Sequence, residues 1–112
     1  MAKALAGRRW FPIWGVMHHV GRRSSRQYAI PVALVPVVRE DIFLIGLPWG
    51  PKTNWAQNVL ADGRATVTWK GRDHAVSQPR LVGPDEAVAV AKPVIRRLVA
   101  SGTFPAFLML QR

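Results

Sequence analysis

Short apolar runs with β-strand character, each followed by a short polar turn, are the feature that most constrains this sequence. Three of them succeed one another: IWGVMHHV at 13–20, YAIPVALVPVV at 28–38 and DIFLIGL at 41–47. Strands joined by connections this short pair in antiparallel fashion. Pro31 and Pro36 lack the backbone N–H of a ladder, so they predict an edge or a bulge in the second strand.

The second half of the chain alternates helices with further strands. TNWAQNVLADG (53–63) predicts a short helix that Thr53 or Asn54 can cap at its start and that Gly63 ends. RATVTWK (64–70) and HAVSQPRLV (74–82) predict a hairpin across Gly71-Arg72-Asp73. A helix is expected from 84 to about 100, kinked at Pro93, before a last strand, FPAFLML, at 104–110.

Together these elements predict an α+β, mainly β, fold. We expect about six antiparallel strands in a small barrel, with two or three helices packed on it. At 112 residues the chain is expected to form one domain, spanning 1–112. The absence of cysteine excludes disulfides, thiolate catalysis and zinc–thiolate sites.

The net charge of +10 concerns partners more than fold. It arises from 16 basic and 6 acidic residues. Such a surface attracts nucleic acid, anionic lipid or a small polyanionic ligand, although a merely basic surface accounts for it too. The first 20 residues do not fit a signal peptide, because Pro12 interrupts a short apolar stretch and no small-residue cleavage site follows. We therefore expect a cytoplasmic protein.

Aromatic residues stand beside arginines at the start of the chain. Trp10, Phe11 and Trp14 lie close to Arg8 and Arg9. This composition leaves a peripheral membrane contact open. Core packing is the expected use of these aromatics.

Two loops are candidates for binding an anion. HHVGRRSSRQYAIPV (18–32) places Arg22, Arg23 and Arg26 in one turn without an acid, which suits either an anion site or a solvated turn. GLPWGPKTNW (46–55) places Lys52 and Thr53 before a helix. It fails the spacing of a nucleotide phosphate loop, but a lysine beside free helix-start amides can hold an anion. An ordinary capped helix with a solvated lysine is the alternative.

Other chemistries find little support in the sequence. His18 and His19 are adjacent on an expected strand, so their side chains face opposite ways and cannot share a metal. No metal site is expected. No carboxylate is placed to orient a histidine toward Ser24 or Ser25 as in a hydrolase triad.

Three segments in this order resemble the deazaflavin-dependent nitroreductase family. Gly21, Arg22, Arg23 and Ser24 match the family's glycine–arginine turn, and Pro31 matches its strand proline. Asn54, Trp55, Asn58 and Val59 match its helix motif, and GRDHAVSQPRLV its basic hairpin. The resemblance covers about residues 15–83. Ser25 stands where the family usually has glycine, and Tyr28 and Ala29 where an arginine is common.

The resemblance implies a split β-barrel oxidoreductase that uses coenzyme F420, a deazaflavin carrying a phosphate and a chain of glutamates. It would transfer hydride to an electron-poor small molecule such as a quinone, an enone or a nitroaromatic. The implied cofactor-binding residues are Arg22, Arg23, Ser24, Pro31, Val32, Trp49, Gly50, Lys52, Thr53, Trp55 and Asn58. Tyr28, the only tyrosine, is a weak catalytic candidate.

Several alternatives remain at this point. An FMN- or haem-binding split barrel shares the expected fold, and a carrier could bind the deazaflavin without turnover. A nucleic-acid-binding module ranks last, because no helix-turn-helix, zinc-finger or aromatic RNA-binding motif is present. The resemblance also leaves a homodimer open.

Overall fold

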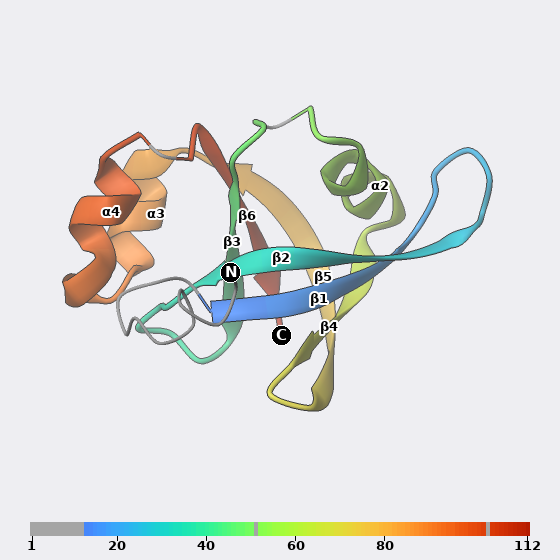
Figure 1. Cartoon of the computed structure of the whole chain (residues 1–112), viewed down its shortest axis with the longest axis horizontal. Coiled ribbons are helices and arrows are strands. Elements are labelled where there is room, and N and C mark those ends of the chain that lie inside the picture. Colours follow the sequence, from blue (N-terminus) through green and yellow to red (C-terminus); the bar gives the residue numbers. More distant parts are fainter. Residues whose placement is uncertain (1–12, 51, 103) are drawn as a thin grey trace, which may run out of the picture.

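The computed structural model describes residues 13–50, 52–102 and 104–112, and its centre is a closed six-stranded barrel (Figure 1). The strands are β1 (Ile13–Val20), β2 (Gln27–Val35), β3 (Ile42–Leu47), β4 (Arg64–Trp69), β5 (Arg72–Val82) and β6 (Ala106–Gln111). Their order around the barrel is β1-β2-β3-β6-β5-β4, and every pairing is antiparallel. The predicted mainly β fold with packed helices is confirmed.

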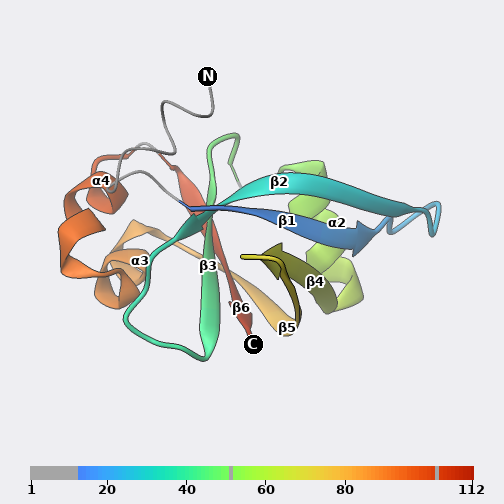
Figure 2. The same ribbon diagram turned by 60° about the horizontal axis from the view of Figure 1, so that its bottom comes forward.

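Helices cover the barrel in two places (Figures 1 and 2). α2 (Asn54–Asp62) lies beside one end of the β1–β2 hairpin. On the other side lie α3 (Pro84–Val90), the 3₁₀ turn η1 (Pro93–Ile95) and α4 (Arg96–Ala100). In the described part of the chain, no helix has both the length and the apolar content needed to cross a bilayer.

Two apolar cores explain the long hydrophobic runs of β3 and β6. All six residues of β3 are buried, because alternate side chains enter different cores. Phe43, Ile45 and Leu47 join the core that Trp55 and Val59 of α2 close. A second set packs against α3, η1 and α4: Ala33, Val35, Ile42, Leu44, Val82, Phe107 and Met109.

The expected proline effect in β2 has a clear structural basis. Pro31 pairs with Val16 of β1, whereas β3 pairs only with Ala33–Val35. The first part of β2 therefore has β1 as its strand neighbour, and a missing N–H is tolerated there. This free margin of β2 borders the site described below.

The prediction of one kinked helix from 84 to about 100 is wrong. Ala91 and Lys92 are extended, with ψ of 148° and 145°, and Ala91 forms an isolated bridge with Val37. Pro93 accounts for the break, because the residue before a proline is driven out of the helical region. Backbone bonds from Lys92 to Pro36 (3.0 Å) and from Val38 to Val90 (2.9 Å) fix the extended segment.

Two smaller expectations also need correction. The β4–β5 turn consists of Lys70 and Gly71, both with positive φ, one residue earlier than predicted. Trp14 was expected in the core, but 49% of its surface is exposed. Trp10 and Phe11 lie outside the described residues.

Candidate ligand-binding site

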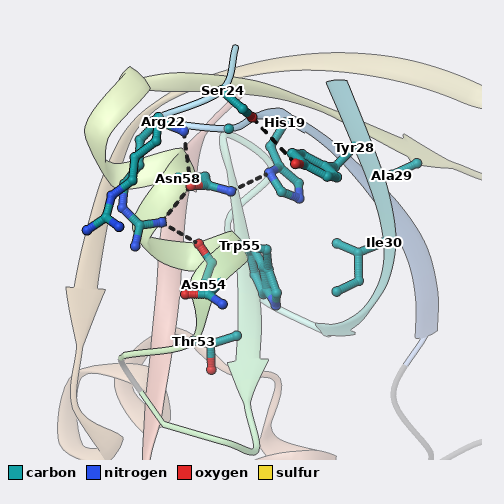
Figure 3. A pocket seen from close by; sticks show the side chains of 12 residues that line it. His19, Arg22, Ser24, Tyr28, Ala29, Ile30, Thr53, Asn54, Trp55 and Asn58 are labelled. Atoms are coloured by element: carbon teal, nitrogen blue, oxygen red, sulfur yellow. Dashed lines mark hydrogen bonds between the residues drawn. The ribbon is translucent and has the colours of Figure 1, made fainter. Parts of the chain in front are cut away.

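A hollow of about 660 Å³ opens between the β1–β2 turn, the first part of β2 and the start of α2 (Figure 3). We call it the turn–helix hollow. Its lining residues are His19, Gly21, Arg22, Arg23, Ser24, Tyr28, Ala29, Ile30, Thr53, Asn54, Trp55 and Asn58. Two arginines and no acid appear in this described lining, so the hollow favours an anion.

The turn that carries the arginines is closed by its own backbone. Gly21 N–H donates to the Arg26 carbonyl at 2.8 Å, and Ser25 N–H donates to the Gly21 carbonyl at 3.0 Å. Ser24 Oγ accepts from Arg26 N–H at 3.3 Å. Ser25 has φ of 59°, the left-handed region in which glycine is favoured. The turn therefore has the backbone conformation that glycine favours, although a serine occupies this position.

Asn58 joins this turn to α2. Its Oδ1 accepts from Arg22 Nη1 at 2.6 Å and from Arg22 backbone N–H at 3.2 Å. Arg22 Nη1 also donates to the Asn54 carbonyl at 3.4 Å. Asn58 is 8% exposed, so these bonds satisfy an amide that would otherwise be buried without partners. The turn and the helix thus form one unit.

The start of α2 leaves backbone donors available. Its N-cap is Thr53, but no side chain makes a cap hydrogen bond, and Thr53 Oγ1 donates to the Gly50 carbonyl at 2.8 Å. The first turn of α2 holds no acidic residue. Uncapped first-turn amides carry a partial positive charge and point out of the helix start. The predicted capping by Thr53 or Asn54 is accordingly absent.

The remaining wall of the hollow is largely apolar and aromatic. Trp55 is 9% exposed and packs into the barrel core, with Ile30 beside it. Tyr28 is 43% exposed and stacks on His19, with ring centroids 5.4 Å apart and an interplanar angle of 22°. Tyr28 Oη and Ser24 Oγ are 3.5 Å apart. A planar ring has flat surfaces to lie against on this wall.

His19 also lines the hollow, although the sequence motifs did not indicate it as a site residue. It is 7% exposed, and burial lowers the pKa of its imidazole below the ordinary value of 6.5. Asn58 Nδ2 lies 3.3 Å from His19 Nδ1. A period-two count along β1 would have found it, because Met17 and His19 are both buried and share a face. His18 faces the other way and bonds Thr68 Oγ1 at 2.9 Å.

The structure gathers some of the residues that the resemblance implied and not others. Six line the hollow: Arg22, Arg23, Ser24, Thr53, Trp55 and Asn58. So does Tyr28, the weak catalytic candidate. The other five lie outside its lining: Pro31, Val32, Trp49, Gly50 and Lys52.

Of the five residues outside the lining, one lies in the barrel core, one on the surface of β2 and three in the loop before α2. Val32 is 3% exposed within the barrel core, and Pro31 is exposed on β2. Trp49 is 86% exposed in the loop before α2. Gly50 has φ of 91° and bonds Leu47 and Thr53, so it shapes this loop. Lys52 is exposed next to Thr53.

Within residues 13–50, 52–102 and 104–112, no three metal-ligating side chains converge. The described part of the chain also forms other hollows. One of about 580 Å³ shares His19, Tyr28 and Ala29 with the turn–helix hollow and includes Asp62 and Arg64. One of about 270 Å³ lies near Phe43, Trp69 and Arg112.

Comparison with solved structures shows the same fold in other proteins. The structure of an F420-H2 dependent reductase (FDR-A) is similar with a TM-score of 0.61 and 13% identity, over 88% of this chain and 93% of that one. A structure described as a domain-swapped dimer is similar with a TM-score of 0.60 and 12% identity, over 88% and 79%.

A third similar structure is Atu2129, a protein of unknown function from Agrobacterium tumefaciens str. C58. The TM-score is 0.55 and the identity 18%, over 91% of this chain and 48% of that one. No protein-family model and no curated protein sequence matches the chain. At these identities the similarity concerns the fold.

Proposed function

We propose that this protein binds coenzyme F420 in the turn–helix hollow and transfers its hydride to an electron-poor small molecule. The observation that carries the proposal is the meeting of two arginines and an uncapped helix start in one hollow with an aromatic wall. The similar fold of a protein described as an F420-H2 dependent reductase supports the choice of cofactor.

The residues of the hollow fit a cofactor that is anionic at one end and planar at the other. Arg23 and Arg22, with the first amides of α2, would hold the phosphate or a glutamate carboxylate through charge-assisted bonds. Trp55, Ile30 and Tyr28 would contact the ring. The guanidinium of Arg22 already donates to Asn58. Arg23 makes no such bond to Asn58, so it is the arginine that we expect to contribute most to binding the anion.

When bound, F420 supplies the hydride, and the chain supplies orientation and a pocket with reduced access to water. The substrate class proposed is a quinone, an enone or a nitroaromatic. Tyr28 Oη, exposed at the hollow beside Ser24 Oγ, is the candidate for holding a proton near the acceptor. Because Tyr28 is exposed, water can reach the same place and deliver that proton instead.

FMN and haem fit the same hollow differently. FMN, like F420, has a phosphate and a planar ring, so only a comparison of the two binding affinities separates these cofactors. Haem would take the Tyr28 phenol or a ring nitrogen of His19 as its iron ligand. Asn58 directs its NH₂ group at His19 Nδ1, which places the imidazole proton on Nε2. The nitrogen that faces the hollow is therefore in the wrong state to coordinate iron.

The test is a parallel titration of the purified protein with F420, FMN and haem, followed by fluorescence and absorbance. We expect F420 to bind most tightly. Arg23→Ala should weaken F420 binding at least tenfold, since bonds between charged groups contribute about 1.5–3 kcal/mol. Arg97→Ala, an exposed arginine on α4 on the other side of the barrel, should leave the affinity unchanged.

Turnover separates an enzyme from a carrier. Reduced F420 should be oxidised in the presence of the protein and a quinone such as menadione, faster than without protein. Tighter binding of FMN or haem than of F420 would overturn the choice of cofactor. Binding of F420 without turnover over a panel of quinones, enones and nitroaromatics would replace the enzyme by a carrier.

A further inference from the structure

The hydrogen bonds that link Arg22, Asn58 and His19 can run in one direction only. Arg22 is a pure donor, so the Asn58 atom 2.6 Å from Arg22 Nη1 has to be the carbonyl oxygen. The same oxygen accepts from Arg22 backbone N–H. Asn58 therefore directs its NH₂ group toward His19, and the orientation of the amide is fixed by the arginine.

The direction of these hydrogen bonds fixes which ring nitrogen of His19 carries the proton. Because Asn58 Nδ2 donates, His19 Nδ1 has to accept, at 3.3 Å. A neutral imidazole with a free lone pair on Nδ1 carries its proton on Nε2. Protonating Nδ1 would bring two donors face to face, which adds to the effect of burial in keeping this ring neutral.

The Nε2 side of His19 belongs to the turn–helix hollow. In Figure 3 the ring's bonded nitrogen faces Asn58, while the other nitrogen points away from it, on the side where Ile30 and Trp55 lie. His19 lines the hollow, and Tyr28 stacks on one face of its ring. His19 thus presents an N–H donor on the side of the hollow where Ile30 and Trp55 lie.

We propose that His19 is a ligand-binding residue whose Nε2–H donates a hydrogen bond to the carbonyl-bearing edge of a planar ring held in this hollow. The inference rests on the proposed function and extends it by naming the residue that selects the ring. A ring without an acceptor at that edge would leave this N–H unpaired when the ring covers it, which weakens binding. The hollow thereby favours dione-type rings such as deazaflavins and flavins over apolar aromatics.

Two substitutions of His19 separate its hydrogen bond to the ligand from its hydrogen bond with Asn58. In His19→Asn the side-chain oxygen can still accept from Asn58, but no donor reaches the hollow. In His19→Gln the terminal NH₂ can still reach the hollow. We expect His19→Asn to weaken F420 binding roughly tenfold, the factor that a lost neutral hydrogen bond gives, and His19→Gln to weaken it less.

The neighbouring histidine provides the matched control. His18→Asn and His18→Gln change an exposed residue of the same strand whose side chain bonds Thr68, outside the hollow's lining, and should leave F420 affinity unchanged. The deazaflavin riboside that lacks phosphate and glutamates is a second probe. It should respond to His19→Asn by the same factor as F420, whereas Arg23→Ala should affect F420 alone.

A ligand-free measurement completes the test. ¹⁵N NMR of the histidine rings should show His19 with its proton on Nε2 at neutral pH. A proton on Nδ1, equal F420 affinity of His19→Asn and wild type, or weaker binding by His19→Gln than by His19→Asn would overturn the inference while leaving the proposed function standing. No binding of F420 by the wild type would overturn the proposed function, and the ligand assigned to His19 with it.

Discussion

Ser25 holds the β1–β2 turn in a left-handed backbone conformation, with φ of 59°. This conformation costs a residue with a Cβ about 1–2 kcal/mol relative to glycine. The family that the sequence resembles usually has glycine at this position, and the positive φ of the turn is the physical reason. The turn positions Arg22 and Arg23, so it is kept despite the strain.

Ser25→Gly should therefore stabilise the protein. We expect a gain of about 0.5–1 kcal/mol in the free energy of unfolding, since relief of the strained φ exceeds the extra freedom of glycine in the unfolded chain. Urea unfolding measures it. Ser24→Gly is the control and should destabilise, because Ser24 Oγ accepts from Arg26 N–H. A loss of stability in Ser25→Gly would show that the turn is unstrained.

His19 makes stability depend on pH. Its folded-state pKa lies below 6.5, so the unfolded chain binds a proton more readily. The contribution of His19 is fully present above pH 6.5 and is lost as pH falls from there toward the folded-state pKa. The hydrogen bond from Arg39 lowers the pKa of Asp41, and the hydrogen bond from Arg80 lowers the pKa of Glu86. These two carboxyls therefore change the stability only at lower pH, below their ordinary pKa values of 3.8 and 4.5.

The free energy of unfolding should therefore fall as pH is lowered from 6.5 to 4.5. His19→Gln should reduce that fall, because glutamine does not titrate. Unfolding in urea at a series of pH values compares the two proteins. A fall of equal size in both would assign the effect to other groups.

Among the secondary-structure elements, β3 and the segment before β6 fit each other with no spare room. A Cβ added to Gly46 would lie 2.6 Å from the ring of Phe104, which is 8% exposed. Gly46 is thus required by packing and not by its backbone conformation. The chain after α4 is held against β3 by this contact.

Gly46→Ala should cost about 1–3 kcal/mol of stability, as overpacking of a core does. In a Phe104→Leu background the same substitution should cost less, because the smaller side chain can move away. A double-mutant cycle by urea unfolding measures the coupling. Equal costs in both backgrounds would show that Phe104 is not the obstacle.

The strands could be predicted from the sequence because their signal is local. Apolar runs bounded by polar turns identified all six, and the turn chemistry limited the errors to a few residues. The segment 84–100 could not be predicted in the same way. Pro93 is a local signal that disfavours the helical region at Lys92. The extension of Ala91 also depends on its pairing with Val37, and a contact between residues so far apart leaves no trace in local propensity.

At the scale of the whole molecule, the barrel has its helices on separate sides, and the hollow lies at the α2 side (Figures 1 and 3). The motifs predicted that the arginine turn and the helix start lie together, and both line one hollow. They could not foresee that Val32 enters the core or that Trp49 stays exposed, since this depends on how the barrel closes. The homodimer expected as one option remains a prediction.

The central claim is that the turn–helix hollow binds F420, and amide chemical-shift mapping tests it most directly. Titrating F420 into ¹⁵N-labelled protein should shift the amides of Gly21–Arg26 and of Thr53–Asn58, together with Tyr28 and Ile30. Amides near the hollow of Phe43, Trp69 and Arg112 should not move. Shifts confined to that second group, or none at saturating F420, would contradict the account.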